Sequence, residues 1–125
     1  MEKITAIKKR AEELDDLLSS NNYGYQFNEE TSKNIFIKIT ELKNAAAHYY
    51  FFLNEKMIEG ELTELEDLFI WPTMCDVIEN TTKINVDGIP YELTHGHIAG
   101  VLDELDCCLY SIERYKRMGD PNFYL

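Results

Sequence analysis

Aspartate and glutamate are the only side chains that this sequence concentrates enough to suggest a chemical role. Residues 39–113 contain fifteen of them against Lys43, Lys56 and Lys83, whereas residues 1–38 hold seven acids and six bases. The net charge of −11 therefore arises from one stretch. Such a field attracts cationic surfaces and repels nucleic acid and anionic lipid. The pattern favours a protein partner with a basic groove.

Two segments of this stretch, 57–82 and 84–113, contain no lysine or arginine. Helical acids three or four residues apart lie about 5–6 Å from each other, which is comparable with the spacing of phosphate charges on a duplex. Their repulsion costs a few tenths of a kcal/mol per pair. Charge alone favours a plainer interpretation, a solvated face kept for solubility. The predicted partner-binding carboxylates are Glu59, Glu61, Glu64, Glu66, Asp67, Asp76, Glu79, Asp103, Glu104, Asp106 and Glu113.

Histidine and cysteine are the other residues with metal-binding chemistry. A structural zinc site needs four ligands at paired spacings such as C-x₂-C, and the sequence has no such pair. The adjacent Cys107 and Cys108 would point to different sides of a helix. His95 and His97 read as polar residues near the start of a helix, with His48 far away in sequence. We predict no metal site and no cofactor.

Catalysis also lacks a sequence signature. A catalytic cysteine needs a thiolate beside a histidine, whereas Cys75 and Cys108 lie among apolar residues, where we expect buried, inert thiols. No glycine-rich phosphate loop, HExxH or GxSxG motif occurs. No pair of carboxylates stands out as an acid–base pair. We predict that the protein is not an enzyme.

The segments that must position the acids are mainly helical. Apolar residues recur at helical spacing over 4–18 and again over 35–57. We expect a loop over 19–24, an N-cap at Asn28 and a left-handed Gly60 that ends the second helix. The stretch around residue 50 is apolar almost all round, which indicates burial in the core or at a partner subunit. The residues concerned are Tyr49, Tyr50, Phe51 and Phe52.

A third helix is predicted to start near Thr63, because Thr63 and Glu66 have the spacing of a capping box. Trp71-Pro72 should interrupt it, leaving a short helical piece over 72–79. Residues 83–93 carry the one β signal, since Asp87-Gly88 suits a tight hairpin turn.

The last helix is predicted to be capped by Thr94 and ended by Gly119 and Pro121. The expected fold is therefore mainly α. It is a single compact domain over residues 1–125, with about four to five helices and one small β-hairpin near 83–93.

Composition indicates a folded chain, because 45% of the residues are hydrophobic and eight are tyrosines. The beginning of the sequence lacks the apolar run of a signal peptide, and no apolar stretch approaches the roughly 18–20 residues that span a bilayer. Three cysteines, an odd number, indicate reduced thiols. We expect a soluble cytoplasmic protein.

The centre of the chain resembles the Ocr family of phage antirestriction proteins, with one single-residue gap over about thirty-five positions. The matching residues are Asn44-Ala45, His48-Tyr49-Tyr50, Met57, Glu59-Gly60, Glu64, Glu66-Asp67, Ile70, Pro72 and Asp76-Val77-Ile78. A weaker similarity follows in Tyr91-Glu92-Leu93-Thr94, Asp103, Leu105, Leu109, Glu113 and Tyr115.

This resemblance implies a helical homodimer that imitates bent duplex DNA and occupies the DNA-binding groove of type I restriction–modification enzymes in an infected bacterial host. It implies neither catalysis nor a cofactor. The chain departs from the family in being much less acidic and in its basic segment 114–117. The hairpin near 83–93 also looks like an insertion. By the resemblance, the mimic surface includes Glu59, Glu64, Glu66, Asp67, Asp76, Asp103 and Glu113.

The predicted partner is thus a DNA-binding host defence enzyme, with no direct contact to nucleic acid or membrane. Two other partner classes fit the acidic surface. One is a cationic nuclease that the chain neutralises as an immunity protein or antitoxin, through a compact patch rich in tyrosine. The other is a different DNA-processing enzyme, such as a CRISPR effector or a DNA glycosylase.

Overall fold

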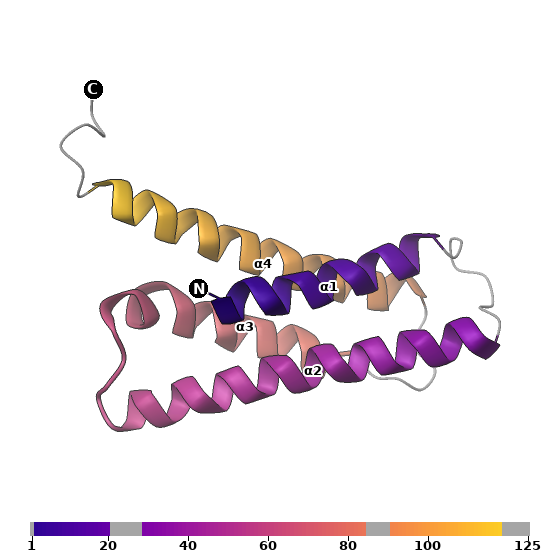
Figure 1. Ribbon diagram of the computed structural model, residues 1–125, viewed down its shortest axis with the longest axis horizontal. Coiled ribbons are helices and arrows are strands. Elements are labelled where there is room, and N and C mark those ends of the chain that lie inside the picture. The colour runs from indigo at the N-terminus through magenta and orange to yellow at the C-terminus, as the bar shows by residue number, and fades with distance from the viewer. Residues whose placement is uncertain (1, 21–28, 85–90, 119–125) are drawn as a thin grey trace.

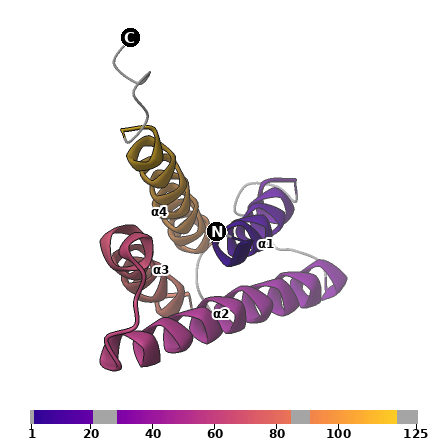
Figure 2. The same cartoon turned by 60° about the vertical axis from the view of Figure 1, so that its left-hand side comes forward.

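The structure, a computed structural model, describes residues 2–20, 29–84 and 91–118. It contains the helices α1 (Glu2–Ser20), α2 (Glu29–Ile58), α3 (Trp71–Thr82) and α4 (Tyr91–Met118), and a short π-helix, η1 (Glu66–Ile70), that leads directly into α3 (Figure 1). Helix α1 packs against α2 and α4, and α3 packs against the same two helices. Viewed near the bundle axis, α2 and α4 therefore occupy opposite corners (Figure 2).

The core consists of the apolar stripes that the sequence places at helical spacing, which confirms a mainly helical fold. Leu14, Leu42, Leu53 and Leu105 are fully buried. Each fully buried leucine contributes about 1.5–3 kcal/mol relative to an exposed one. Every element contributes to this core, whose other apolar members are Ile4, Ile7, Ala11, Leu18, Ile35, Ile39, Ala46, Tyr49, Ile70, Met74, Val77, Ile84, Ile98, Val101, Cys108 and Ile112.

Helix α2 ends as the sequence predicts. Gly60 has a φ of 72°, a conformation that strains any residue with a Cβ. The N–H of Gly60 donates to the carbonyl of Met57 at 3.1 Å, and the N–H of Glu61 donates to that of Lys56 at 2.8 Å. These two bonds are the Schellman pattern that closes a helix on a left-handed residue. The turn redirects the chain into η1.

The predicted break at Trp71-Pro72 is wrong, because the helix continues through Pro72 to Thr82. In a regular α-helix, Pro72 would leave the carbonyl four residues before it without a donor and would press against that carbonyl. The turn before it is widened instead: the N–H of Trp71 donates to the carbonyl of Glu66, five residues back. Such a π turn accommodates the proline without ending the helix.

No strand occurs in the described part of the chain. Tyr91–Leu93, predicted as the second arm of a β-hairpin, form the first turn of α4, so the strand prediction is wrong there and the helix begins before Thr94. A three-residue alternation is a weak β signal, and packing of α4 against α1 and α3 outweighs it. The loop predicted over 19–24 is wrong at Ser19 and Ser20, which are the last residues of α1. The rest of that loop lies outside the described residues, as do the predicted turn at Asp87-Gly88, the Asn28 cap, Gly119 and Pro121.

Candidate acidic partner-binding surface

The predicted carboxylates fall into separate places in the bundle. One set, which we call the side set, lies on α3 and α4, two helices that pack against each other. A second set lies at the end of the bundle where α2 turns into η1 (Figure 1). The side set comprises Asp76, Glu79, Asp103, Glu104 and Asp106, and the end set comprises Glu59, Glu61, Glu64 and Asp67.

Carboxyl groups of α3 and α4 meet across the packing of these two helices. A Cβ added at Gly100 of α4 would lie only 3.5 Å from the side-chain amide of Asn80 in α3. Beside this approach, the carboxyls of Glu104 and Asp76 are hydrogen-bonded. Burial, followed by the charge of Asp76 and this hydrogen bond, raises the pKa of Glu104, and Asp103 adds to the effect. Two like charges in contact destabilise the fold unless a proton lies between them.

We expect Glu104→Gln to raise the melting temperature at pH 7. A carboxyl whose pKa is raised by folding contributes stability below its ordinary pKa of 4.5 and loses that contribution as pH rises through the folded pKa. Thermal unfolding at several pH values should therefore show a gain at neutral pH that disappears below about pH 4.5. Asp103→Asn, at an exposed neighbouring position, should change the melting temperature less. A loss of stability at pH 7 would contradict the predicted repulsion.

Carboxylates of α1, which the sequence interpretation missed, extend the acidic side of the bundle. Glu12, Asp15 and Asp16 line a groove between α1 and α4 together with Asp106. The only basic residue in that lining is Lys8, whose Nζ lies 2.6 Å from Asp106 Oδ1. The signal was present, since positions 12, 15 and 16 share one helical face. The balanced total charge of residues 1–38 concealed it. We call the combined surface the lateral face: Glu12, Asp15, Asp16, Asp76, Glu79, Asp103, Glu104 and Asp106.

One histidine contacts a residue of the lateral face. His95 Nε2 lies 2.9 Å from Asp15 Oδ1, so this histidine bridges α4 to α1. Neither His95 nor its neighbours form a metal site: the described residues include no group of three or more histidine, cysteine, aspartate or glutamate side chains that could hold a metal ion.

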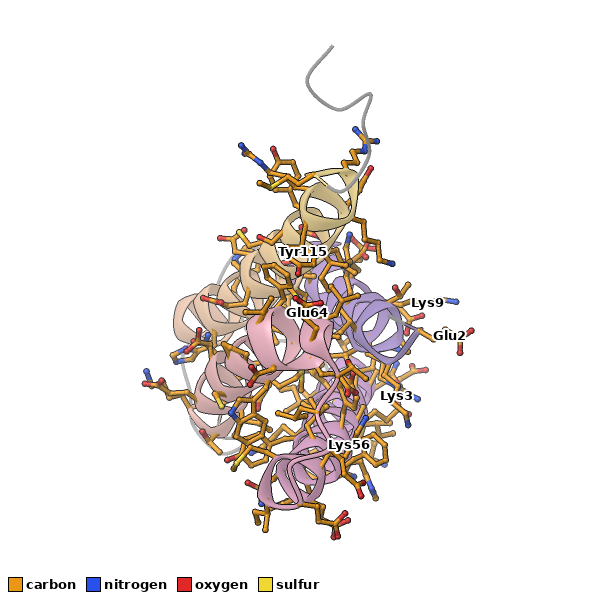
Figure 3. The ribbon with its side chains drawn as sticks, turned by 90° about the vertical axis from the view of Figure 1, so that its left-hand side faces the viewer. Glu2, Lys3, Lys9, Lys56, Glu64 and Tyr115 are labelled. Atoms are coloured by element: carbon orange, nitrogen blue, oxygen red, sulfur yellow. The ribbon has the colours of Figure 1, made fainter. Side chains whose placement is uncertain are left out.

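The end set has a structural contact of its own. The hydroxyl of Tyr115 donates a hydrogen bond to Glu64, and the two side chains point toward each other in Figure 3. This bond raises the pKa of the Tyr115 phenol. The ring of Tyr115 also meets that of Phe69 edge to face, with centroids 5.3 Å apart. Glu64 therefore helps to hold the end of α4 against the segment before α3.

Glu66 is engaged inside the molecule. Its Oε1 lies 2.6 Å from Lys56 Nζ and accepts the N–H of Thr63 at 2.9 Å, while its own N–H donates to Thr63 Oγ1 at 3.3 Å. These bonds confirm the predicted capping box. Burial raises the pKa of Glu66, but the bonds from Lys56 and Thr63 outweigh burial, so the pKa lies below its ordinary value. With its side chain only 13% exposed, Glu66 presents little charge to a partner.

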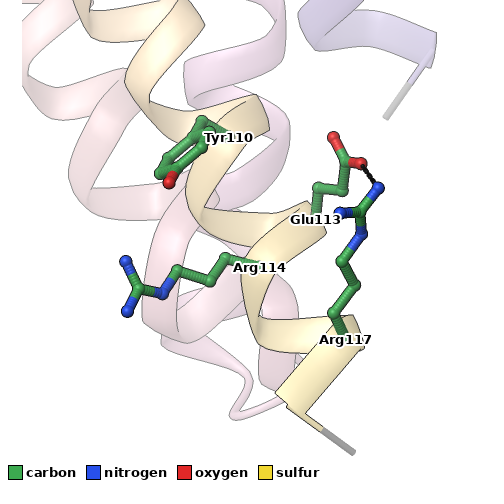
Figure 4. Close-up of a pocket in the computed structure, with 4 residues that line it drawn as sticks. All are labelled: Tyr110, Glu113, Arg114 and Arg117. Carbon is green, nitrogen blue, oxygen red and sulfur yellow. Dashed lines mark hydrogen bonds and ion pairs between the residues drawn. The ribbon is translucent and has the colours of Figure 1, made fainter. Parts of the chain in front are cut away.

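Glu113 lies among bases at the end of α4. Its Oε1 is 2.7 Å from Arg117 Nη2, and the two side chains share a shallow pocket with Tyr110 and Arg114 (Figure 4). Its charge is thus compensated locally. Figure 4 shows the two arginines of this pocket, Arg114 and Arg117, near the end of α4.

The four aromatic residues predicted to lie in the core or at a partner subunit, residues 49–52 of α2, have different environments. Tyr49 belongs to the core, and its burial raises the pKa of the phenol to about 12. Tyr50 is half-buried and stacks on Trp71 with ring centroids 5.2 Å apart. Phe51 and Phe52 are 62% and 49% exposed. Of these four residues, Phe51 and Phe52 are the ones exposed enough to contact a partner subunit.

Two of the three cysteines lie in surroundings that disfavour nucleophilic chemistry. Burial raises the pKa of the Cys75 and Cys108 thiols, which disfavours the thiolate that catalysis requires. Cys107 is exposed on the outside of α4.

No helix in the described ranges combines the length and the apolar character needed to cross a membrane. A scan against models of protein families, a search of curated proteins and a search of solved structures each returned no match.

Proposed function

We propose that this protein is a non-enzymatic inhibitor that presents carboxylates in place of DNA phosphates to a DNA-binding defence enzyme. The target we favour is a type I restriction–modification enzyme in a bacterium infected by phage, in agreement with the resemblance to Ocr-type proteins. The lateral face occupies the basic groove of the enzyme and excludes DNA by competition. A homodimer is part of this proposal.

One observation carries the proposal: the fold brings carboxyl groups from different helices into contact, and repulsion between like charges so placed opposes folding. Asp76 and Glu104 meet across the packing of α3 and α4, and Asp103 adds its charge. A solvated surface kept only for solubility needs no such contact, because acids placed apart dissolve a protein equally well. A partner that supplies lysine and arginine would relieve the repulsion on binding.

The distribution of bases supports the same mechanism. Of the lysines and arginines beside the acids of α3 and α4, Lys8, Lys83 and Arg117 each have a carboxylate partner, in Asp106, Glu79 and Glu113. The intervening segment, 84–113, has no lysine or arginine. The face therefore offers a cationic groove little repulsion.

A competition titration tests the proposal. A purified type I restriction–modification enzyme is bound to labelled duplex DNA, and this protein is added at two salt concentrations. We expect displacement of the DNA at stoichiometric protein, and weaker displacement at the higher salt, because the contacts are between exposed charges. Absence of displacement at both salt concentrations would reject this target.

The exposure of Tyr110 favours a second candidate, an immunity protein that neutralises a cationic nuclease. Tyr110 is 63% exposed and lies seven residues, or about two helical turns, after Asp103 on α4. Tyrosine is enriched among the few residues that contribute most of the binding energy at protein interfaces. Inhibition of a nuclease by a single protomer, with no effect on the restriction enzyme, would identify this function instead.

A further inference from the structure

The outer side of α2 carries apolar side chains that no other described element covers. Ile37 and Phe51 are 51% and 62% exposed. With Lys33, Asn44 and Glu55, which are also exposed, they follow one another at intervals of four, seven, seven and four residues. At 100° per residue, these five positions lie within about 20° of one direction on the helix. We call them the α2 seam.

The α2 seam is complementary to the same seam of a second copy that runs in the opposite direction. Ile37 and Phe51 lie seven residues before and after Asn44, and Lys33 and Glu55 lie eleven residues before and after it. In a helix pair with a two-fold axis at Asn44, Ile37 of one subunit faces Phe51 of the other, and Lys33 faces Glu55. Each pair occurs twice. The more lateral Phe36 and Phe52, 50% and 49% exposed, lie at matching levels eight residues from the axis.

We propose that a second copy of this chain covers the α2 seam in an antiparallel arrangement centred on Asn44. Charge selects this direction: a parallel pair would place Lys33 against Lys33 and Glu55 against Glu55, which is unfavourable. Ile58, at the end of α2, falls opposite Glu30 and lies outside the pairing. The inference deepens the homodimer of the proposed function and does not depend on the target enzyme.

The position of α2 in the bundle is compatible with this interface. Because α2 and α4 occupy opposite corners, pairing through the outer side of α2 leaves the lateral face uncovered (Figure 2). The core of each subunit is also undisturbed, since the buried residues of α2, such as Leu42 and Leu53, point the other way. Association therefore needs no rearrangement of the fold.

Charge reversal measured by sedimentation equilibrium at low ionic strength tests the inference. Lys33→Glu places a second carboxylate against Glu55 at two symmetric sites, and Glu55→Lys places two lysines together at each. We expect either change to raise the dimer dissociation constant by about tenfold. Lys33→Glu combined with Glu55→Lys in one chain should restore dimerisation. An equimolar mixture of the two single variants should also restore it, because the mixed dimer brings opposite charges together again.

A matched control is Lys9→Glu, which makes the same change of charge on α1, where the side chain extends away from the bundle (Figure 3). It should leave the dimer constant unchanged. A wild-type protein that stays monomeric, an unaffected Lys33→Glu variant, or tighter association of that variant would each overturn the antiparallel seam. The DNA competition titration is independent of these results: displacement by a monomeric protein would reject the seam and retain the function.

Discussion

Reversal of three carboxylates of the lateral face should weaken displacement of DNA from the target enzyme by about 100-fold. The variant combines Glu12→Lys, Glu79→Lys and Asp103→Lys, one exposed position on each of α1, α3 and α4. An exposed charge pair contributes up to about 1 kcal/mol, so three lost contacts amount to about 3 kcal/mol, or roughly 100-fold in affinity. The competition titration measures this change. Circular dichroism should show unaltered helicity, since none of the three side chains is buried.

The control variant reverses three exposed acids of the end set. Glu59→Lys, Glu61→Lys and Asp67→Lys make the same change of net charge, from −11 to −5. If the lateral face makes the contact, this variant should bind at most about tenfold more weakly, through the long-range field alone. Equal losses in the two variants would show that net charge matters and that the lateral face is not the binding surface.

Removal of the Glu66 side chain should destabilise the fold by about 2 kcal/mol. Glu66→Ala deletes the acceptor of the Thr63 N–H, a capping interaction of about 1 kcal/mol. It also leaves the ammonium of Lys56, whose side chain is only 24% exposed, without its carboxylate. This second loss adds about another 1 kcal/mol, because the pair is only partly buried. Urea unfolding at pH 7 provides the measurement.

Glu61→Ala is the control, since Glu61 is exposed and should change stability by no more than about 0.5 kcal/mol. The pH dependence adds a second check. Folding lowers the pKa of Glu66, so its contribution is present above the ordinary value of 4.5 and is lost as pH falls through the folded pKa. The charge-dependent part of the effect should fade in that acid range. An effect of Glu66→Ala no larger than that of Glu61→Ala would refute the structural role.

Local patterns in the sequence predicted the parts of the fold that depend on local physics. Gly60 could be placed because a left-handed residue after an apolar helix nearly demands glycine. Thr63 and Glu66 could be paired because a capping box involves only one helical turn. The same locality explains the errors. The sequence shows that Pro72 has no N–H to donate within a helix. It does not show that a π turn before Pro72 can accommodate the proline without ending the helix.

The acidic surface was predictable in composition but not in arrangement. Glu66 satisfied two patterns at once, as a surface acid and as a capping residue, and its contact with Lys56 depends on how α2 and η1 pack. Asp76 and Glu104 are too far apart in sequence for their contact to be read from spacing. Asp15 and Asp16 were hidden because neighbouring bases balance the charge of this segment, and their position beside Asp106 depends on how α1 packs against α4. Each of these facts belongs to tertiary structure.

If the protein is the proposed inhibitor and dimerises along the α2 seam, the diagonal placement of α2 and α4 determines how many enzyme molecules one dimer can bind. Subunits joined along α2 carry their lateral faces on opposite outer sides, so the two faces cannot enter one groove together. Each subunit is then one binding equivalent, and a single dimer can bridge two enzyme molecules when the enzyme is in excess. When more inhibitor is added, each dimer would bind only one enzyme molecule and the bridged assemblies would separate. The mass of the assembly would therefore rise and then fall during one titration.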